Sequence, residues 1–193
     1  MKPKVLITPL CGPERSAWIN PRLCASLLRA VKDPRFDTDV ELIYGSHGID
    51  TARNLAIDKA RQKQVSWNVQ IDNDMVCENL LSVLAEADTA ERHVVAVAYG
   101  ITAPSGNLEP SVVFTGKRHQ NFMQVTAAGA GVLMISSKVW QALPVLFEGN
   151  HEDVHFCRIA QAAGFQIWTH ASLAGHLHTV DLTAQLRGVL PQK

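Results

Sequence analysis

Two aspartates directly follow an apolar segment near the middle of the chain. The segment is residues 65–71, and the motif after it is Asp72-Asn73-Asp74. If 65–71 forms a strand, residues two apart project to the same side, so both carboxylates converge beyond its carboxyl end. Ligands of open α/β sheets bind at this edge. Adjacent carboxylates repel each other, and Mg²⁺ or Mn²⁺ held between them and substrate phosphates would relieve that repulsion.

A polar turn is the alternative interpretation of the same residues. Asp74 would then cap a helix predicted from residue 78, with its side chain accepting a hydrogen bond from a backbone amide. Spacing alone does not distinguish the two.

A second acidic pair, Glu152-Asp153, opens a helix predicted over 152–163. Negative charge in a first turn interacts favourably with the helix dipole, so capping is one interpretation. Amide donors at a helix start also favour the ionised carboxylate. Asp153 could therefore accept a proton from a substrate hydroxyl, which is the catalytic interpretation.

Two histidines, His176 and His178, are also two residues apart and follow the last predicted strand. In an extended chain they face the same side. A lone histidine is usually a packed or surface residue, but neutral imidazole is also a good ligand for Mn²⁺. One histidine with one aspartate would make a transferase-type metal site.

Gly129 and Gly131 bracket one alanine before an apolar run. Such glycines allow a substrate to lie close to the backbone, or they mark a bulge; their spacing is not the dinucleotide-binding fingerprint. Arg53 falls in the first turn of a helix that is predicted to be capped by Asp50 or Thr51. It can bind a phosphate or the carboxylates of the acidic motif, or it can simply lie on the surface.

The elements that must position these residues alternate in type through the first half of the chain. Helices are predicted at 21–31, with Asn20-Pro21 as the start signal, and at 51–63 and 78–87. Strands are predicted at 5–8, ending in Pro9, and at 40–44, 65–71 and 93–98. This alternation is typical of a parallel sheet covered by helices.

The second half of the chain changes character. Residues 99–110 predict a loop, 111–115 and 122–126 two short strands, 132–135 a strand, 137–142 and 152–163 helices, and 165–169 the last strand. The expected fold class is therefore α/β.

The composition excludes several classes of protein. The chain has 193 residues, 47% of them hydrophobic, and a formal net charge of zero, so no nucleic-acid footprint is present. Its four cysteines form no Cys-x-x-Cys pair, which argues against a structural zinc site or a disulfide framework. No apolar stretch predicts an integral membrane segment. A cytoplasmic protein is expected, and a homo-oligomer is compatible with the sequence.

In order and spacing, these landmarks resemble the GT-A nucleotide-sugar glycosyltransferases, especially small family 2-like members. The resemblance covers residues 4–178 and rests on Ile7-Thr8-Pro9, Ala52-Arg53-Asn54, Asp72-Asn73-Asp74, the glycine-rich segment leading to Glu152-Asp153, and Gly175-His176. It implies a three-layer α/β/α sandwich with a mostly parallel central sheet. It also implies one catalytic domain over 1–178, with a nucleotide-binding half at 1–98, an acceptor half at 99–178 and a tail at 179–193.

The resemblance further implies a role for each landmark. The donor, a UDP- or GDP-sugar, would be bordered by Thr8, Pro9, Tyr44, Arg53, Asp72, Asn73, Gly129 and Gly131. Mn²⁺ or Mg²⁺ would be held by Asp74 with Asp72 and by His176, with His178 as the alternative histidine. Asp153, beside Glu152, matches the general base of inverting members, and the acceptor would be a small-molecule or glycan hydroxyl. The chain lacks the Gln-x-x-Arg-Trp element of processive synthases, so a polysaccharide synthase is not expected.

Three other functions compete with this interpretation. Haloacid-dehalogenase phosphatases also carry Asp-x-Asp after an apolar strand, but there it closes the first strand of the core, whereas about two β-α units precede it here. A nucleotidyltransferase with a related sheet is a second alternative, which pyrophosphate release from a nucleoside triphosphate would identify. A non-catalytic nucleotide-sugar-binding protein is the third, and it would bind the donor tightly without transferring the sugar.

Overall fold

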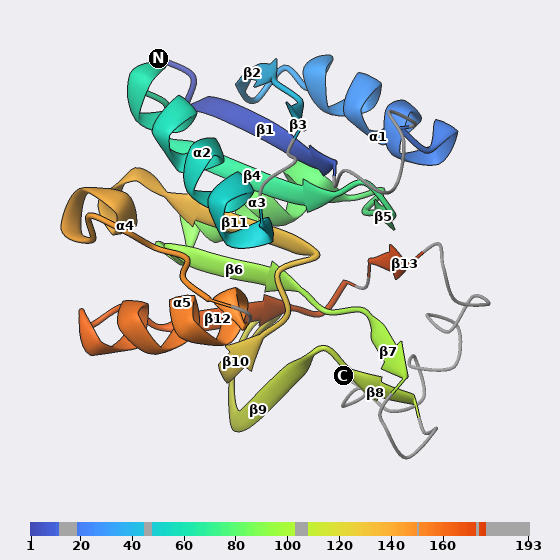
Figure 1. The fold of residues 1–193 in the computed structure, drawn as a ribbon. Helices are drawn as coiled ribbons and strands as arrows, with labels where there is room; N and C mark the ends of the chain where they lie inside the picture. Colours follow the sequence, from blue (N-terminus) through green and yellow to red (C-terminus); the bar gives the residue numbers. More distant parts are fainter. Residues whose placement is uncertain (12–18, 45–47, 103–107, 150, 173, 177–193) are drawn as a thin grey trace.

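The computed structural model describes residues 1–11, 19–44, 48–102, 108–149, 151–172 and 174–176. Its centre is a nine-stranded sheet in the order β2-β1-β4-β11-β6-β12-β10-β9, with β3 also pairing with β1 (Figure 1). The strands are β1 (Lys4–Cys11), β2 (Asp37–Val40), β3 (Ile43–Tyr44), β4 (Trp67–Asp72), β6 (Val94–Val97), β9 (Val112–His119), β10 (Phe122–Ala128), β11 (Val132–Ser136) and β12 (Ile167–His170). The predicted tail at 179–193 lies outside the described residues.

Most strands of this sheet run in one direction. β2, β3 and β4 are parallel to β1, and β12 is parallel to β6. β11 lies antiparallel between β4 and β6, and β10 lies antiparallel between β12 and β9. The predicted fold class, an α/β protein with a mostly parallel central sheet, is confirmed.

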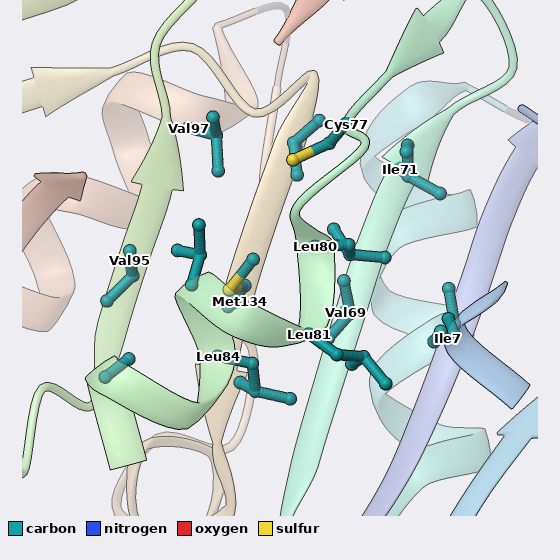
Figure 2. Packing of buried hydrophobic residues seen from close by; sticks show 14 of the residues in the cluster. Ile7, Val69, Ile71, Cys77, Leu80, Leu81, Leu84, Val95, Val97 and Met134 are labelled. Atoms are coloured by element: carbon teal, nitrogen blue, oxygen red, sulfur yellow. The ribbon is translucent and has the colours of Figure 1, made fainter. Parts of the chain in front are cut away.

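Helices cover both faces of the sheet. α1 (Pro21–Val31) and α3 (Leu80–Thr89) pack on one face, and α2 (Ile49–Gln62), α4 (Ser137–Ala142) and α5 (Glu152–Ala162) pack on the other. Figure 2 shows α3 placing Leu80, Leu81 and Leu84 over strand residues that include Val69 and Met134. Successive strand residues point to opposite faces, so each inner strand contributes to both apolar layers. The result is the three-layer arrangement that the sequence predicts.

Three of the five described helices, α1, α4 and α5, begin at the predicted residues 21, 137 and 152, and α3 begins two residues later than predicted. The Asn20 side chain accepts a hydrogen bond from the Arg22 amide at 2.8 Å, as an N-cap before Pro21 should. α5 begins at Glu152 as predicted. α2, however, begins at Ile49 after Gly48, so the predicted capping by Asp50 or Thr51 is wrong. Asp50 instead lies inside the first turn.

The first strand does not end at Pro9 but continues to Cys11. The strand that pairs with it on one side is interrupted at this point, because β2 ends opposite Ile7 and β3 begins opposite Leu10. The single strand predicted at 40–44 is therefore wrong, and two separate strands lie along this edge. Proline has no amide hydrogen to donate to a partner. The break in pairing on that side coincides with the missing donor.

The segment 99–110, predicted as a loop, contains a small antiparallel pair. β7 (Gly100–Thr102) pairs with β8 (Leu108–Pro110). A further two-stranded sheet joins β5 (Met75–Val76) to β13 (Gly175–His176). Within the described part of the chain, no helix combines the length and hydropathy that a membrane span requires.

Candidate active site

The acidic motif lies at the carboxyl end of β4. Asp72 is the last residue of that strand, Asn73 and Asp74 form the turn after it, and β5 follows. β13 pairs with β5 so that His176 lies opposite Met75. The fold therefore brings the backbone of His176 beside the residue that follows Asp74. The His176 side chain is not described, and His178 lies outside the described residues.

The alternative role of Asp74 as a helix cap is wrong. α3 begins at Leu80 with Asn79 as its N-cap residue, five positions after Asp74. Asp74 lies half-buried in the turn between β4 and β5.

Arg53 is the centre of a buried polar network on the α2 face of the sheet. Its Nε donates to Glu152 Oε1 at 3.1 Å, and its Nη2 donates to Asp72 Oδ1 at 3.1 Å and Oδ2 at 3.3 Å. Its Nη1 lies 3.4 Å from Gln70 Oε1. Only 3% of the arginine side chain is exposed. The sequence left open whether Arg53 binds a phosphate, binds the carboxylates or lies on the surface. In the structure it binds carboxylates.

The charge around Asp72 is unbalanced. The pKa of Asp72 is raised to about 6: burial is the main cause, the Arg53 guanidinium opposes it, and the negative charges of Asp74 and Glu152 support it. Asp72 keeps 28% of its side chain exposed, so it faces the edge of the sheet rather than the core. One buried cation therefore serves several carboxylates here, and a site of this kind favours a further cation.

Tyr99 explains why Gly129 and Gly131 are glycines. A Cβ atom added at Gly129 would lie 2.7 Å from the Tyr99 hydroxyl oxygen, and one at Gly131 would lie 2.8 Å from the Tyr99 ring. Neither glycine has a positive φ, so the requirement is space. The predicted close approach to the backbone is thus made by this tyrosine, and contact of either glycine with a donor stays a prediction.

The pKa of Tyr99 responds to the charges of both Asp72 and Asp153. The pKa of Tyr99 is raised to about 12, first by burial and then by the negative charges of Asp72 and Asp153. Asp153 is half-buried in the first turn of α5, where its Oδ1 accepts from the Val154 amide at 2.8 Å. The phenol is therefore influenced by the charges of both acidic groups, and their joint role at one site stays a prediction.

The residues of the first strands that are predicted to border the nucleotide differ in exposure. Thr8 is fully buried: its hydroxyl donates to the Val69 carbonyl at 3.4 Å and accepts from Asn68 Nδ2 at 3.2 Å. Pro9 is also buried. Both residues are therefore buried in the structure, and their contact with a nucleotide stays a prediction. Tyr44, at the end of β3, is 53% exposed and is free of such burial.

Sequence reasoning missed the polar residues that support this site. Asn68 and Gln70 are fully buried and precede Asp72 at two-residue spacing, so all three face α2. The signal is legible in the sequence of β4, Trp-Asn-Val-Gln-Ile-Asp, where apolar and polar residues alternate in a strand buried on both faces. Buried amides of this kind need partners, and Arg53 supplies one.

The described residues do not by themselves complete a metal centre. Among them, no three His, Cys, Asp or Glu side chains form a group that could hold a metal ion. The chemistry of the donors still fits a hard divalent cation, because Asp74 offers carboxylate oxygens in an acidic environment. A cavity of about 580 Å³, lined by Arg61, Ser66 and Trp140 among others, lies at the opposite end of β4 and is not part of this site.

No family model and no curated protein matches the sequence. Solved structures do match in fold. A197 from STIV aligns with a TM-score of 0.65 and 17% identity over 94% of this chain and 87% of that one. GalNAc-T7, crystallised with UDP, GalNAc and Mn²⁺, gives a TM-score of 0.63 and 12% identity, covering 91% of this chain but 44% of its own. UDP-glucose pyrophosphorylase complexed with UDP-glucose gives 0.64 and 8% identity over 98% of both chains.

These likenesses define the fold as GT-A-like. The matched structures include a glycosyltransferase and a nucleotidyltransferase that were both solved with nucleotide-containing ligands. At such low identity the likeness concerns the fold alone, and the reaction must be argued from the site.

Proposed function

We propose that this chain is a metal-dependent glycosyltransferase that moves a sugar from a UDP- or GDP-sugar to a hydroxyl acceptor. The observation that carries the proposal is the pairing of β13 with β5, which brings Gly175-His176 beside the turn that holds Asp74. Gly175 and Val76, which are 99 positions apart in sequence, are thus neighbours at the carboxyl edge of the sheet, where α/β proteins bind ligands.

The charge of the site supports a metal-bound diphosphate. Arg53, the cation that the described structure places among these carboxylates, is already paired with Asp72 and Glu152. A nucleoside diphosphate would add negative charge to an acidic site, so it needs a counter-ion. Mn²⁺ or Mg²⁺ held by Asp74 and His176 would neutralise the charge that develops on the leaving diphosphate.

The other residues then have separate tasks. Residues 1–98 bind the nucleotide: Tyr44 is exposed to stack on the base, and Asp72 with Asn73 faces the ribose. Residues 99–178 bind the acceptor. Asp153 takes the proton of the acceptor hydroxyl while that oxygen bonds to the anomeric carbon and the bond from this carbon to the diphosphate breaks.

Nucleotidyl transfer is a second candidate function. It is supported by the match to UDP-glucose pyrophosphorylase, which spans 98% of both chains, so neither chain has a large unmatched segment. The products separate the two reactions. Nucleotidyl transfer releases pyrophosphate from a nucleoside triphosphate, whereas glycosyl transfer releases a nucleoside diphosphate from a nucleotide sugar.

The test incubates the protein with Mn²⁺ and either UDP- and GDP-sugars plus a panel of small-molecule and glycan hydroxyl acceptors, or nucleoside triphosphates plus sugar 1-phosphates. We expect nucleoside diphosphate from at least one sugar donor and no pyrophosphate from any triphosphate. Pyrophosphate without diphosphate would overturn the proposal in favour of nucleotidyl transfer. Tight donor binding with neither product would identify a non-catalytic nucleotide-sugar-binding protein.

His176→Ala should weaken Mn²⁺ affinity by roughly ten- to a hundredfold, the usual cost of losing support at a metal site. The effect should be visible by titrating Mn²⁺ in the presence of the nucleotide. His178→Ala should have less effect, and His119→Ala, at an exposed position of β9, serves as the control. Equal Mn²⁺ affinity in His176→Ala and wild type would remove His176 from the site.

A further inference from the structure

The first turn of α5 is not fixed by an ordinary helix cap. Its N-cap residue, His151, makes no capping hydrogen bond through its side chain. The turn is instead held by Glu152, whose Oε1 accepts from Arg53 Nε at 3.1 Å. Both side chains of this ion pair are at most 10% exposed. The position of the turn therefore depends on a residue of α2.

The neighbouring residue of α2 holds the segment that leads into α5. Asn54 Nδ2 donates to the Phe147 carbonyl at 2.7 Å, and its Oδ1 accepts from the Leu146 and Phe147 amides at 3.3 and 3.2 Å. The Phe147 ring in turn stacks on Phe156 of α5 with a centroid distance of 4.9 Å. Consecutive residues of one helix thus hold both the approach to α5 and its first turn.

The other side of Arg53 reaches the acidic motif. Its Nη2 binds both oxygens of Asp72, and Gln70 Nε2 donates to the Arg53 backbone carbonyl at 3.1 Å. The guanidinium is planar and presents its donors in a fixed fork. Any movement of the first turn of α5 relative to Asp72 must therefore distort at least one of these contacts.

We propose that Arg53, Asn54 and Glu152 are positioning residues that set Asp153 at a fixed place relative to the nucleotide-side carboxylate Asp72. Arg53 then acts through protein carboxylates and not as a phosphate ligand, and Glu152 acts through Arg53 and not on substrate. This inference rests on the proposed function, because it assigns Asp153 to the acceptor and Asp72 to the donor. A catalytic group displaced by about 1 Å can cost about a hundredfold in rate.

If Glu152 positions Asp153, its loss should lower kcat without lowering nucleotide affinity. If Glu152 took part in donor binding, both quantities should fall together. Removing the Glu152 carboxylate leaves Arg53 bound to Asp72, so nucleotide binding should be kept. The first turn of α5 loses its anchor, so Asp153 is no longer held. Glu152→Gln keeps an oxygen that can accept from Arg53, whereas Glu152→Ala does not.

The experiment compares Glu152→Ala, Glu152→Gln and Asn54→Ala with wild type, and uses Glu148→Ala as the matched control. Glu148 precedes the same helix and lies 3.8 Å from the His155 imidazole, but its side chain is 75% exposed, so this contact should hold the helix far less than the buried Arg53–Glu152 pair. Mn²⁺-dependent UDP and GDP affinity, kcat, acceptor KM and hydrogen exchange of the α5 first-turn amides are measured. We expect Glu152→Ala to keep nucleotide affinity, to lose about 10- to 100-fold in kcat and to exchange faster in that turn. Glu152→Gln should recover part of the rate.

Two results would overturn the inference. One is a loss of nucleotide affinity in Glu152→Ala as large as the loss of kcat, which would place the pair in the donor site. The other is an unchanged kcat with unchanged exchange. If the wild-type protein transfers no sugar, the proposed function fails instead. Exchange and nucleotide affinity then decide the inference: faster exchange in Glu152→Ala with nucleotide affinity kept supports it, and any other pattern refutes it.

Discussion

Arg53→Met is expected to destabilise the protein by about 3–5 kcal/mol, the usual cost of removing one partner of a buried ion pair. Methionine has a similar length but leaves Asp72 and Glu152 without the cation that both contact. Gln70 would also lose a donor to its side-chain oxygen. Few single substitutions outside the apolar core should cost this protein as much.

The loss of stability in Arg53→Met should also depend on pH. The pKa of Asp72 is raised to about 6, above its ordinary value of 3.8, so the folded state binds this proton more tightly than the unfolded state. Such a group contributes stability below the unfolded pKa and loses it as pH rises through the folded pKa. Without Arg53 the folded pKa rises further. The variant should therefore be closer to wild type at pH 5 than at pH 8.

Urea denaturation of metal-free protein at both pH values measures this effect. Arg22→Met is the control, because Arg22 is an exposed residue of α1, and surface changes usually stay within about 0.5 kcal/mol. A cost for Arg53→Met no larger than that of the control would contradict the network. A cost that grows toward pH 5 would contradict the assignment of Asp72 as the group that responds.

Asp153→Asn should lower kcat by about 10²- to 10⁴-fold, the usual contribution of a positioned general base. Asparagine keeps the size of the side chain and its ability to accept a hydrogen bond from the Val154 amide, but it cannot take a proton. Donor binding should be unchanged, because the substitution touches no group on the nucleotide side.

Steady-state kinetics together with nucleotide titration separates these effects. Asp58→Asn is the control, since Asp58 lies on the exposed side of α2. Transfer by Asp153→Asn at nearly the wild-type rate would make Asp153 only a residue of the helix start. A product with retained anomeric configuration would remove the need for a base, and Asp153 would then be assigned to acceptor positioning.

The elements whose signals are local could be predicted from sequence. Asn20-Pro21 carries both the side-chain cap and the fixed φ of a helix start, and α1 begins there. The apolar segment before Asp72 is a strand buried on both faces. The start of α2 was missed because Gly48 has no side chain to signal a cap.

Pairing between distant strands could not be read in the same way. β11 lies between β4 and β6, antiparallel to both, although about 60 residues separate it from β4. Nothing in the local pattern of Val132–Ser136 fixes that neighbour or its direction. Pro9 was read as the end of a strand, yet in the fold the strand continues and its partner breaks instead.

The same distinction between local and long-range signals applies to the residues of the site. The placement of Asp72 and Asp74 follows from local spacing, and the position of Glu152 at a helix start was predicted correctly. The contacts of Arg53 with both Asp72 and Glu152 join residues 19 and 99 positions away, so they depend on the complete fold. Tyr99 was missed because its role appears only once Gly129 and Gly131 are packed against its ring.

Calorimetric titration of UDP and GDP, with Mn²⁺ and with EDTA, tests the central claim most directly when wild type is compared with Asp74→Ala. Asp37→Ala, at an exposed site on β2, controls for the loss of one carboxylate. Wild type and Asp37→Ala should bind at least one of the two nucleotides more tightly with Mn²⁺ than with EDTA. Asp74→Ala should lose that difference while keeping its fold. Identical binding by wild type and Asp74→Ala under both conditions would contradict a metal-dependent diphosphate site at the end of β4.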